Sequence, residues 1–194
     1  MTLLAPPGAY TVKLTAGGRE LSQPLTVKKD PHSTGTEAEI QQQTKMLEEL
    51  RRDAETTATM VNQIELIRSQ LQNLPRIIEA GREADVRKAA VDLEQKLIAI
   101  EGALVELRLT GRGQDGVRWG SKLLGKINYL ANGLASADNQ PTSQQLEVQK
   151  LLEERMAASG GQLDALMGKE LAAFNDLLRR RSLPTIVASA KGGS

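Results

Sequence analysis

Hydrophobic and polar residues alternate strictly only near the start of the chain. In the stretch YTVKLTA the apolar residues occupy every second position, at Tyr10, Val12 and Leu14, which is the period of a β-strand. Gly17 and Gly18 can supply the positive φ angles of a tight turn. Pro24 lies in the returning strand and lacks an N–H, so we expect it at a sheet edge or a bulge. Residues 8–31 therefore predict a β-hairpin.

From Thr36 onward the apolar residues recur every three or four positions, which is the period of helices that pack through one face. Thr36 can cap the first helix and Asp85 the second, and Pro75 predicts a kink or a new helix after Leu74. The apolar stripes of the first three helices are Leu47, Leu50, Ala54, Thr57, Val61, Ile64, Leu71, Leu74 and Ile78, then Val86, Ala90, Leu93, Leu97, Ile100, Leu104 and Leu107, then Trp119, Leu123, Ile127, Leu130, Leu134 and Ala137.

A fourth helix is predicted to begin at Pro141 with Thr142 or Ser143 and to stop near Arg181, because Pro184 follows. At 1.5 Å per residue it would be about 55–60 Å long, with a weak point at Gly160-Gly161. Its stripe is Leu152, Met156, Leu163, Leu166 or Met167, Leu171, Phe174 and Leu178.

The predicted fold class is mainly α, an antiparallel up-down four-helix bundle with long helices, preceded by an N-terminal β-hairpin. The predicted organisation is a hairpin over 1–31, a linker over 32–35, a helical bundle over 36–186 and a flexible tail over 187–194. Two strands cannot build their own core. We therefore expect Tyr10, Val12, Leu14 and Val27 to pack against a helix, or the hairpin to be poorly ordered.

Composition narrows the classes of function. The 25 Lys and Arg residues nearly balance the 24 Asp and Glu residues, which disfavours a nucleic-acid partner. The chain has no Cys, so disulfides, thiolate catalysis and Cys-bound zinc are excluded. The sequence contains no run of 18 apolar residues, which a membrane-spanning helix would need. The N-terminal stretch MTLLAPPGAY has neither the basic nor the long apolar region of a signal peptide.

No motif predicts catalysis. TGRGQDG, with Gly111, Gly113 and Gly116, resembles a phosphate loop, but Ser121-Lys122 is in the wrong order and no strand precedes it, so we interpret it as a connection between helices. His32 is the only histidine and lies in a linker, which disfavours a metal site or a catalytic triad. The acidic pairs Glu48-Glu49 and Glu153-Glu154 are interpreted as surface residues, without the Glu-x-x-His pattern of di-metal bundles.

Three other features are assigned structural roles. Trp119 is expected to close one end of the bundle, and Asn175 to make a surface or interhelix hydrogen bond. Arg179–Arg181 are expected to interact with the helix dipole and with solvent. The sequence therefore predicts no catalytic, cofactor-binding or metal-binding residue and no cofactor.

Several motifs in combination resemble one family. APPGAYTVKLTAGGRELSQPLTVKKDP resembles the last two strands of the Ig-like domain that follows the propeller in large bacterial sortilin-like proteins with BNR repeats, often labelled glycosyl hydrolases. KINYLANGLASADNQPTSQQ at 126–145 and LAAFNDLLRRRSLPTI at 171–186 are similar to their helical C-terminal tail. VRWGSKL at 117–123 departs from the pattern, which would have a proline near Gly120.

The resemblance implies a secreted or periplasmic protein, of which this chain would be a non-catalytic C-terminal structural or interaction module. Its partners would be the intrachain propeller and Ig-like domains, and possible further proteins. Two alternatives stay open. One is a part of a glycosyl hydrolase whose catalytic propeller lies elsewhere, and the other is a free-standing helical-bundle adaptor that oligomerises.

Overall fold

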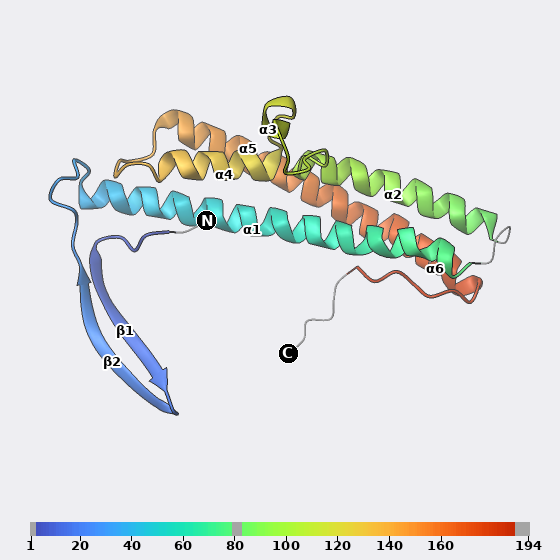
Figure 1. Cartoon of the computed structure of the whole chain (residues 1–194), viewed down its shortest axis with the longest axis horizontal. Coiled ribbons are helices and arrows are strands. Elements are labelled where there is room, and N and C mark those ends of the chain that lie inside the picture. Colours follow the sequence, from blue (N-terminus) through green and yellow to red (C-terminus); the bar gives the residue numbers. More distant parts are fainter. Residues whose placement is uncertain (1–2, 79–82, 189–194) are drawn as a thin grey trace. The chain divides into compact units, whose positions relative to one another are not determined.

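The computed structural model describes residues 3–78 and 83–188 and is mainly helical, with an antiparallel hairpin before the helices (Figure 1). The elements are β1 (Gly8–Ala16), β2 (Arg19–Val27), α1 (Glu37–Asn73), α2 (Ala84–Leu104), α3 (Asp115–Arg118), α4 (Leu123–Leu134), α5 (Ser143–Ala165) and α6 (Ala172–Arg180). The chain forms two compact units, Met1–Arg52 with Asn128–Lys150, and Asp53–Ile127 with Leu151–Ser194. We call them unit 1 and unit 2.

The hairpin in unit 1 has the predicted turn and register. Gly17 and Gly18 have φ angles of 56° and 75°, the combination that a two-residue hairpin turn requires. The strands pair without a bulge from Gly8↔Val27 to Ala16↔Arg19. Pro24 lies opposite Thr11, a position whose N–H would point out of the ladder because bonded and non-bonded pairs alternate. The edge position predicted for Pro24 is thus confirmed, whereas no bulge forms.

One face of the hairpin carries nearly all of its apolar side chains, and most of that face is exposed. The register places Leu14 beside Leu21 and Tyr10 beside Leu25, with Val12 between them. Val12 is 51% exposed, Leu14 58% and Leu21 65%. The predicted packing of Val12 and Leu14 on a helix is therefore wrong. Only the base of the hairpin is half-buried, where Tyr10 donates its hydroxyl proton to the Pro6 carbonyl at 2.6 Å and Val27 lies near α1.

Polar residues define both helix starts in unit 1. Thr36 and Glu39 form a capping box, in which the Glu39 N–H donates to Thr36 Oγ1 at 3.2 Å and the Thr36 N–H to Glu39 Oε2 at 2.7 Å. Thr142 and Gln145 repeat this arrangement before α5. Both predicted starts are confirmed, because the reciprocal bonds satisfy N–H groups that a helix end leaves free.

Helical segments pack together in each unit. In unit 1, Gln43 on α1 donates to the carbonyls of Leu134, the last residue of α4, and of Ala137 just beyond it, and Gln149 on α5 donates to Glu49 on α1 at 3.0 Å. In unit 2, α1 and α2 are antiparallel and α5–α6 completes the core. The structure therefore confirms a mainly helical fold with a hairpin and does not confirm a four-helix bundle.

The core of unit 2 follows most of the predicted stripes, but in α1 Met60 and Ile67 are buried although they were not predicted, and the predicted Val61 is only half-buried. Its buried apolar residues come from α1, α2, the start of α4, α5 and α6 and include Ile64, Ile67, Leu71, Val86, Ala90, Leu93, Leu97, Ile100, Leu104, Ile127, Leu163, Leu166, Leu171, Phe174 and Leu178. Leu107 is an exception, because α2 ends at Leu104 and leaves it 44% exposed. Ala137 likewise lies beyond the end of α4 and is exposed.

Of two predicted helix boundaries in unit 2, one is confirmed and one is wrong. α1 ends at Asn73 and continues as a 3₁₀ turn, Leu74–Arg76, with Pro75 at its start, so the interruption at Pro75 is confirmed. Asp85 does not cap α2. Glu83 precedes the helix with φ 54° and no side-chain cap, and Asp85 lies in the first turn.

The last helix is interrupted by a π-helical stretch, Leu166–Leu171, and not at Gly160-Gly161, which stays α-helical. The buried residues step by three from Leu163 to Leu166, by five to Leu171 and by three to Phe174. A step of five would rotate the apolar stripe off its face in an α-helix. The wider π turn absorbs the extra residue and keeps both halves of the stripe in the core.

Gly35 offers a test of the packing in unit 1. A Cβ atom at this buried glycine would lie 1.8 Å from the Asp138 carbonyl oxygen. We predict that Gly35→Ala destabilises the protein by about 1–3 kcal/mol, because the backbone segments must move apart. Urea unfolding followed by circular dichroism measures the change.

Gly161→Ala is the matched control, because a Cβ there meets open space within a helix. It should stabilise the protein by about 1 kcal/mol. Equal effects of the two substitutions would contradict the close approach of Gly35 to Asp138.

Candidate functional site

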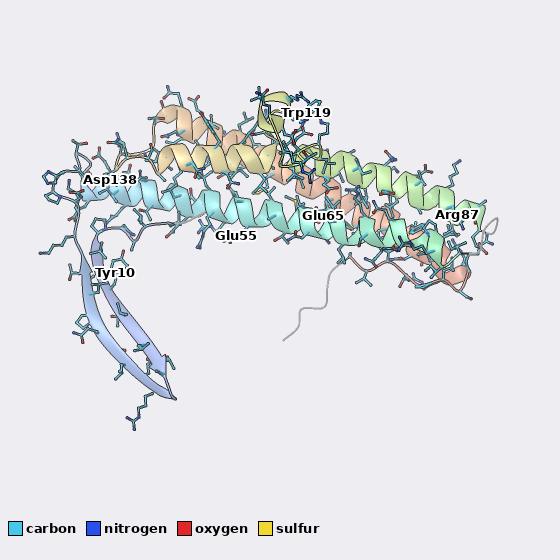
Figure 2. All side chains as sticks on the ribbon, in the orientation of Figure 1. Tyr10, Glu55, Glu65, Arg87, Trp119 and Asp138 are labelled. Atoms are coloured by element: carbon cyan, nitrogen blue, oxygen red, sulfur yellow. The ribbon has the colours of Figure 1, made fainter. Side chains whose placement is uncertain are left out.

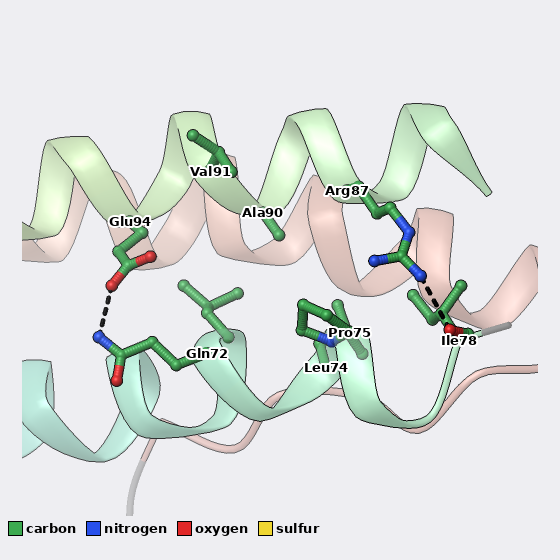
Figure 3. A pocket seen from close by; sticks show the side chains of 9 residues that line it. Gln72, Leu74, Pro75, Ile78, Arg87, Ala90, Val91 and Glu94 are labelled. Carbon is green, nitrogen blue, oxygen red and sulfur yellow. Dashed lines mark hydrogen bonds between the residues drawn. The ribbon is translucent and has the colours of Figure 1, made fainter. Parts of the chain in front are cut away.

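A small apolar pocket in unit 2 lies where α1 ends against the start of α2. Its walls are Leu71, Leu74, Pro75, Ile78, Ala90 and Val91. Polar side chains close it at both ends, as Figure 3 shows. At one end Gln72 Nε2 donates to Glu94 Oε1 at 2.6 Å, and at the other Arg87 Nη2 donates to the Ile78 carbonyl at 2.8 Å. The 3₁₀ turn at Pro75 forms one wall.

The size and the polar contacts of this pocket limit its chemistry. Its volume is about 230 Å³, whereas pockets for small molecules are typically about 300–1,000 Å³. Gln72 and Glu94 are hydrogen-bonded to each other. The pocket therefore fits one apolar side chain better than a substrate that must be activated by an acid or a base.

A buried charge cluster adjoins the pocket. Arg68 on α1 donates to Glu101 on α2, and its Nε lies 3.8 Å from Glu94 Oε1. Glu101 is 1% exposed. Glu101 thus lies inside an apolar stripe, a position that the sequence analysis did not identify. The sequence did contain the signal, because Leu97, Glu101 and Leu104 are spaced by four and three. Two carboxylates around one guanidinium hold α1 against α2, and removal of Arg68 would leave the buried carboxylate of Glu101 without its ion-pair partner.

Two side-chain amides hold the segment that follows α6. Asn175 donates to the Ile186 carbonyl at 3.0 Å and accepts from the Ile186 N–H at 2.8 Å. Gln70 on α1 makes the same pair of bonds with Val187, at 2.8 and 2.9 Å. Ile186 is buried. We call this arrangement the amide clamp. Asn175 was expected to bond at a surface or between helices, and it instead binds the backbone of an extended segment.

The turn into the clamped segment ends α6. The Ser182 N–H donates to the Arg179 carbonyl and the Leu183 N–H to the Leu178 carbonyl, and Ser182 has φ 55°. This is the Schellman pattern, with serine at the position that glycine usually takes. Arg181 pairs with Glu83 at 3.1 Å and with Asp85 at 2.7 Å, so it has specific partners at the start of α2 beyond the expected dipole interaction.

The loop between α2 and α4 has its own polar network. Glu106 accepts from Arg108 Nε at 2.6 Å and Nη2 at 2.8 Å. The guanidinium of Arg108 lies 3.7 Å from the ring centroid of Trp119, within reach of a cation–π interaction. Trp119 is half-buried and precedes α4 (Figure 2). It therefore stacks on a loop arginine and does not stand in the third helix, as its place in the predicted stripe implied.

These contacts shift the pKa values of two carboxyl groups. The hydrogen bonds from Arg108 lower the pKa of Glu106 from 4.5 to about 2. The side-chain hydrogen bond from Thr110, together with its backbone N–H, lowers the pKa of Asp115. The Thr110–Asp115 bonds close the loop that contains Gly111 and Gly113, which have positive φ angles. TGRGQDG is thus a connection between helices, with Gly116 inside the short α3.

The other sequence candidates are not brought together. His32 is exposed in the linker, and its backbone N–H donates to Asp30. Glu48, Glu153 and Glu154 are exposed, whereas Glu49, also interpreted as a surface residue, is half-buried and accepts a hydrogen bond from Gln149. Over residues 3–78 and 83–188, no group of three or more His, Asp or Glu side chains is arranged to hold a metal ion. In the same ranges, no helix combines the length and apolarity needed to cross a membrane.

Comparison with known proteins gives no match, whether the sequence is compared with protein-family models, with curated proteins or with solved structures. The resemblance to sortilin-like proteins is therefore not tested and stays a prediction.

Trp119 is the only tryptophan, so its fluorescence reports on the loop. Because the pKa of Glu106 is lowered in the folded state, its interaction is fully present above pH 4.5 and is lost as the pH falls through about 2. We predict an emission change of Trp119 in that window. Glu106→Gln should show the changed emission already at neutral pH.

Far-UV circular dichroism at each pH separates loss of the Arg108 stack from global unfolding. If Glu106→Gln kept the neutral emission and the acid transition of the wild type, the coupling of Glu106 to Trp119 through Arg108 would be refuted.

Asn175→Ala tests the amide clamp. It removes both hydrogen bonds to Ile186, and we expect faster hydrogen exchange at Ile186 and Val187 and a stability loss of about 2–4 kcal/mol, since the buried Ile186 would also be released. Asn132→Ala, at an exposed position of α4, is the matched control and should change neither. Unchanged exchange in Asn175→Ala would exclude the clamp.

Proposed function

We propose that this chain is a non-catalytic structural and interaction module of a larger secreted β-propeller protein of the sortilin-like type. In this proposal β1 and β2 are the last two strands of an Ig-like sheet. The helical part follows that sheet as a C-terminal tail. A secreted or periplasmic location belongs to the same proposal.

The exposed apolar face of the hairpin carries the proposal. A two-stranded hairpin is at best marginally stable in water, yet β1 and β2 pair over nine residues each. Leu14, Leu21 and Val12 lie on one face and are more than half exposed. Inner faces of Ig-like sandwiches have this alternation, with apolar residues on the side that packs against a second sheet.

The two helical motifs that resemble the family tail have structural roles, which supports the same proposal. The motif at 126–145 covers the end of α4, the turn that packs near Gly35, and the Thr142 capping box. The motif at 171–186 covers α6, Asn175 and Ile186 of the amide clamp.

The polar geometry favours a module without catalysis. Arg68 is bonded to Glu101, and Glu94 to Gln72. Glu106 is held by Arg108. Each of these carboxylates therefore serves a structural contact. If this chain is part of a glycosyl hydrolase, the hydrolysis would take place in the propeller and not in this module.

The size of the native polypeptide tests the proposal. An antibody raised against the 21.0 kDa chain should detect a much larger polypeptide in the exported fraction of the source cells. A 21.0 kDa band confined to the cytosol would refute it. That result, with a defined oligomer in light scattering, would favour the free-standing adaptor.

Leu21→Asp tests the role of the hairpin. In the isolated chain it should leave the Tm unchanged, because Leu21 is 65% exposed. In the larger protein it should lower the Tm of the Ig-like domain, because a charge would enter the sheet interface. Ser22→Asp, on the opposite face, is the matched control and should be neutral in both. Equal effects of the two substitutions in the larger protein would contradict the Ig-like assignment.

A further inference from the structure

A second cleft in unit 2 has a different character from the apolar pocket. It lies between the end of α2, the start of α4 and the middle of α5, and is lined by Ala103, Lys122, Leu123, Lys126, Arg155, Ala158, Ser159 and Gln162. Lys122 and Lys126 are four residues apart, as are Arg155 and Ser159. Each pair therefore lies on one face of its helix segment, and the two pairs line the same cleft.

The charge of this basic cleft is only partly compensated. Three of the lining side chains are cationic and none is a carboxylate. Among residues 3–78 and 83–188, Lys126 and Arg155 have no ion-pair partner within 4.0 Å. Lys122 lies 3.8 Å from Glu106, whose carboxylate is already held by Arg108. Cations gathered without acids favour an anionic ligand.

Ser159 supplies a hydrogen-bond donor to the cleft. The residue is only 8% exposed and lines the cleft. In the described part of the chain its hydroxyl makes no hydrogen bond, unlike the hydroxyls of Thr57 and Thr59, which donate to backbone carbonyls of α1. Its oxygen is not among the fully buried polar atoms without a partner. The hydroxyl is therefore accessible from the cleft and can donate its proton to a ligand there.

The start of α4 adds further donors. Leu123 is the first residue of α4 and lines the cleft. Capping boxes at Thr36 and Thr142 precede α1 and α5, whereas no side chain among the described residues caps α4. No side chain of the described residues therefore occupies its first N–H groups.

We propose that the basic cleft binds a tetrahedral oxyanion, phosphate or sulfate, either free or as an ester of a larger molecule. Lys126 and Arg155 pair with its charge from α4 and α5, and Ser159 donates its hydroxyl proton from the floor. Gln162 can donate its amide. Donors from several directions suit the oxygens of a tetrahedral group better than the two coplanar oxygens of a carboxylate.

Isothermal titration of the full chain at constant ionic strength tests the site. Inorganic phosphate or sulfate should bind, and acetate should not. Arg155→Ala should weaken the binding at least about tenfold, the effect of losing one charge-assisted contact. Ser159→Ala should weaken it severalfold with an unchanged Tm. Lys150→Ala, which removes an exposed charge from α5 outside the cleft, is the matched control.

The remaining outcomes are equally decisive. Glucose 6-phosphate and glucose 6-sulfate are ester probes, and tighter binding of either than of the inorganic ion would identify an ester as the source. No binding of any of these anions would overturn the proposal. Equal losses in Arg155→Ala and Lys150→Ala, or equal binding of acetate, would show nonspecific attraction and overturn it too. The hairpin takes no part, so this result is independent of the proposed module function.

Discussion

Burial of aliphatic side chains along one face of α1 is the constraint on which both units depend. The helix supplies Leu47 and Leu50 to unit 1 and Ile64 and Ile67 to unit 2. The chain contains only one Trp, one Phe and two Tyr. Its cores are therefore built mainly from aliphatic side chains, and burial of each contributes about 1.5–3 kcal/mol to stability. Many such side chains must therefore lie on the same helix face. This explains why the apolar stripes are long. It also explains why the π-helical stretch, where the last helix departs from α-helical geometry, keeps the stripe on the buried face.

The periodicity of the sequence predicted most of the helical fold because burial imposes that periodicity directly. The capping boxes at Thr36 and Thr142 and the break at Pro75 depend on local chemistry, and they too could be predicted. The start of α2 could not, because Asp85 is a good capping residue locally, whereas in the structure it does not cap the helix and pairs, like Glu83, with Arg181, about one hundred residues later.

The polar contacts that shape the candidate sites were less predictable for the same reason. Asn175 and Gln70 are ordinary helix-surface residues in the sequence, and they become the amide clamp only when the segment at Ile186 and Val187 returns to them. Glu101 was missed although it stands in register with Leu97 and Leu104, because an acidic residue in an apolar stripe is usually placed at its margin. The basic cleft joins three elements that no local pattern connects.

The position of Pro24 has a consequence for how the hairpin can extend. Each outer edge of a two-stranded sheet presents unpaired backbone groups that can accept another strand. Along β2 this row is interrupted at Pro24, which has no proton to offer, whereas β1 contains no proline and its outer row is complete. A further strand can therefore pair with the outer edge of β1, whereas β2 is suited to be the edge strand of the sheet. Pro24 alone therefore determines that the sheet can be extended on the β1 side and not on the β2 side.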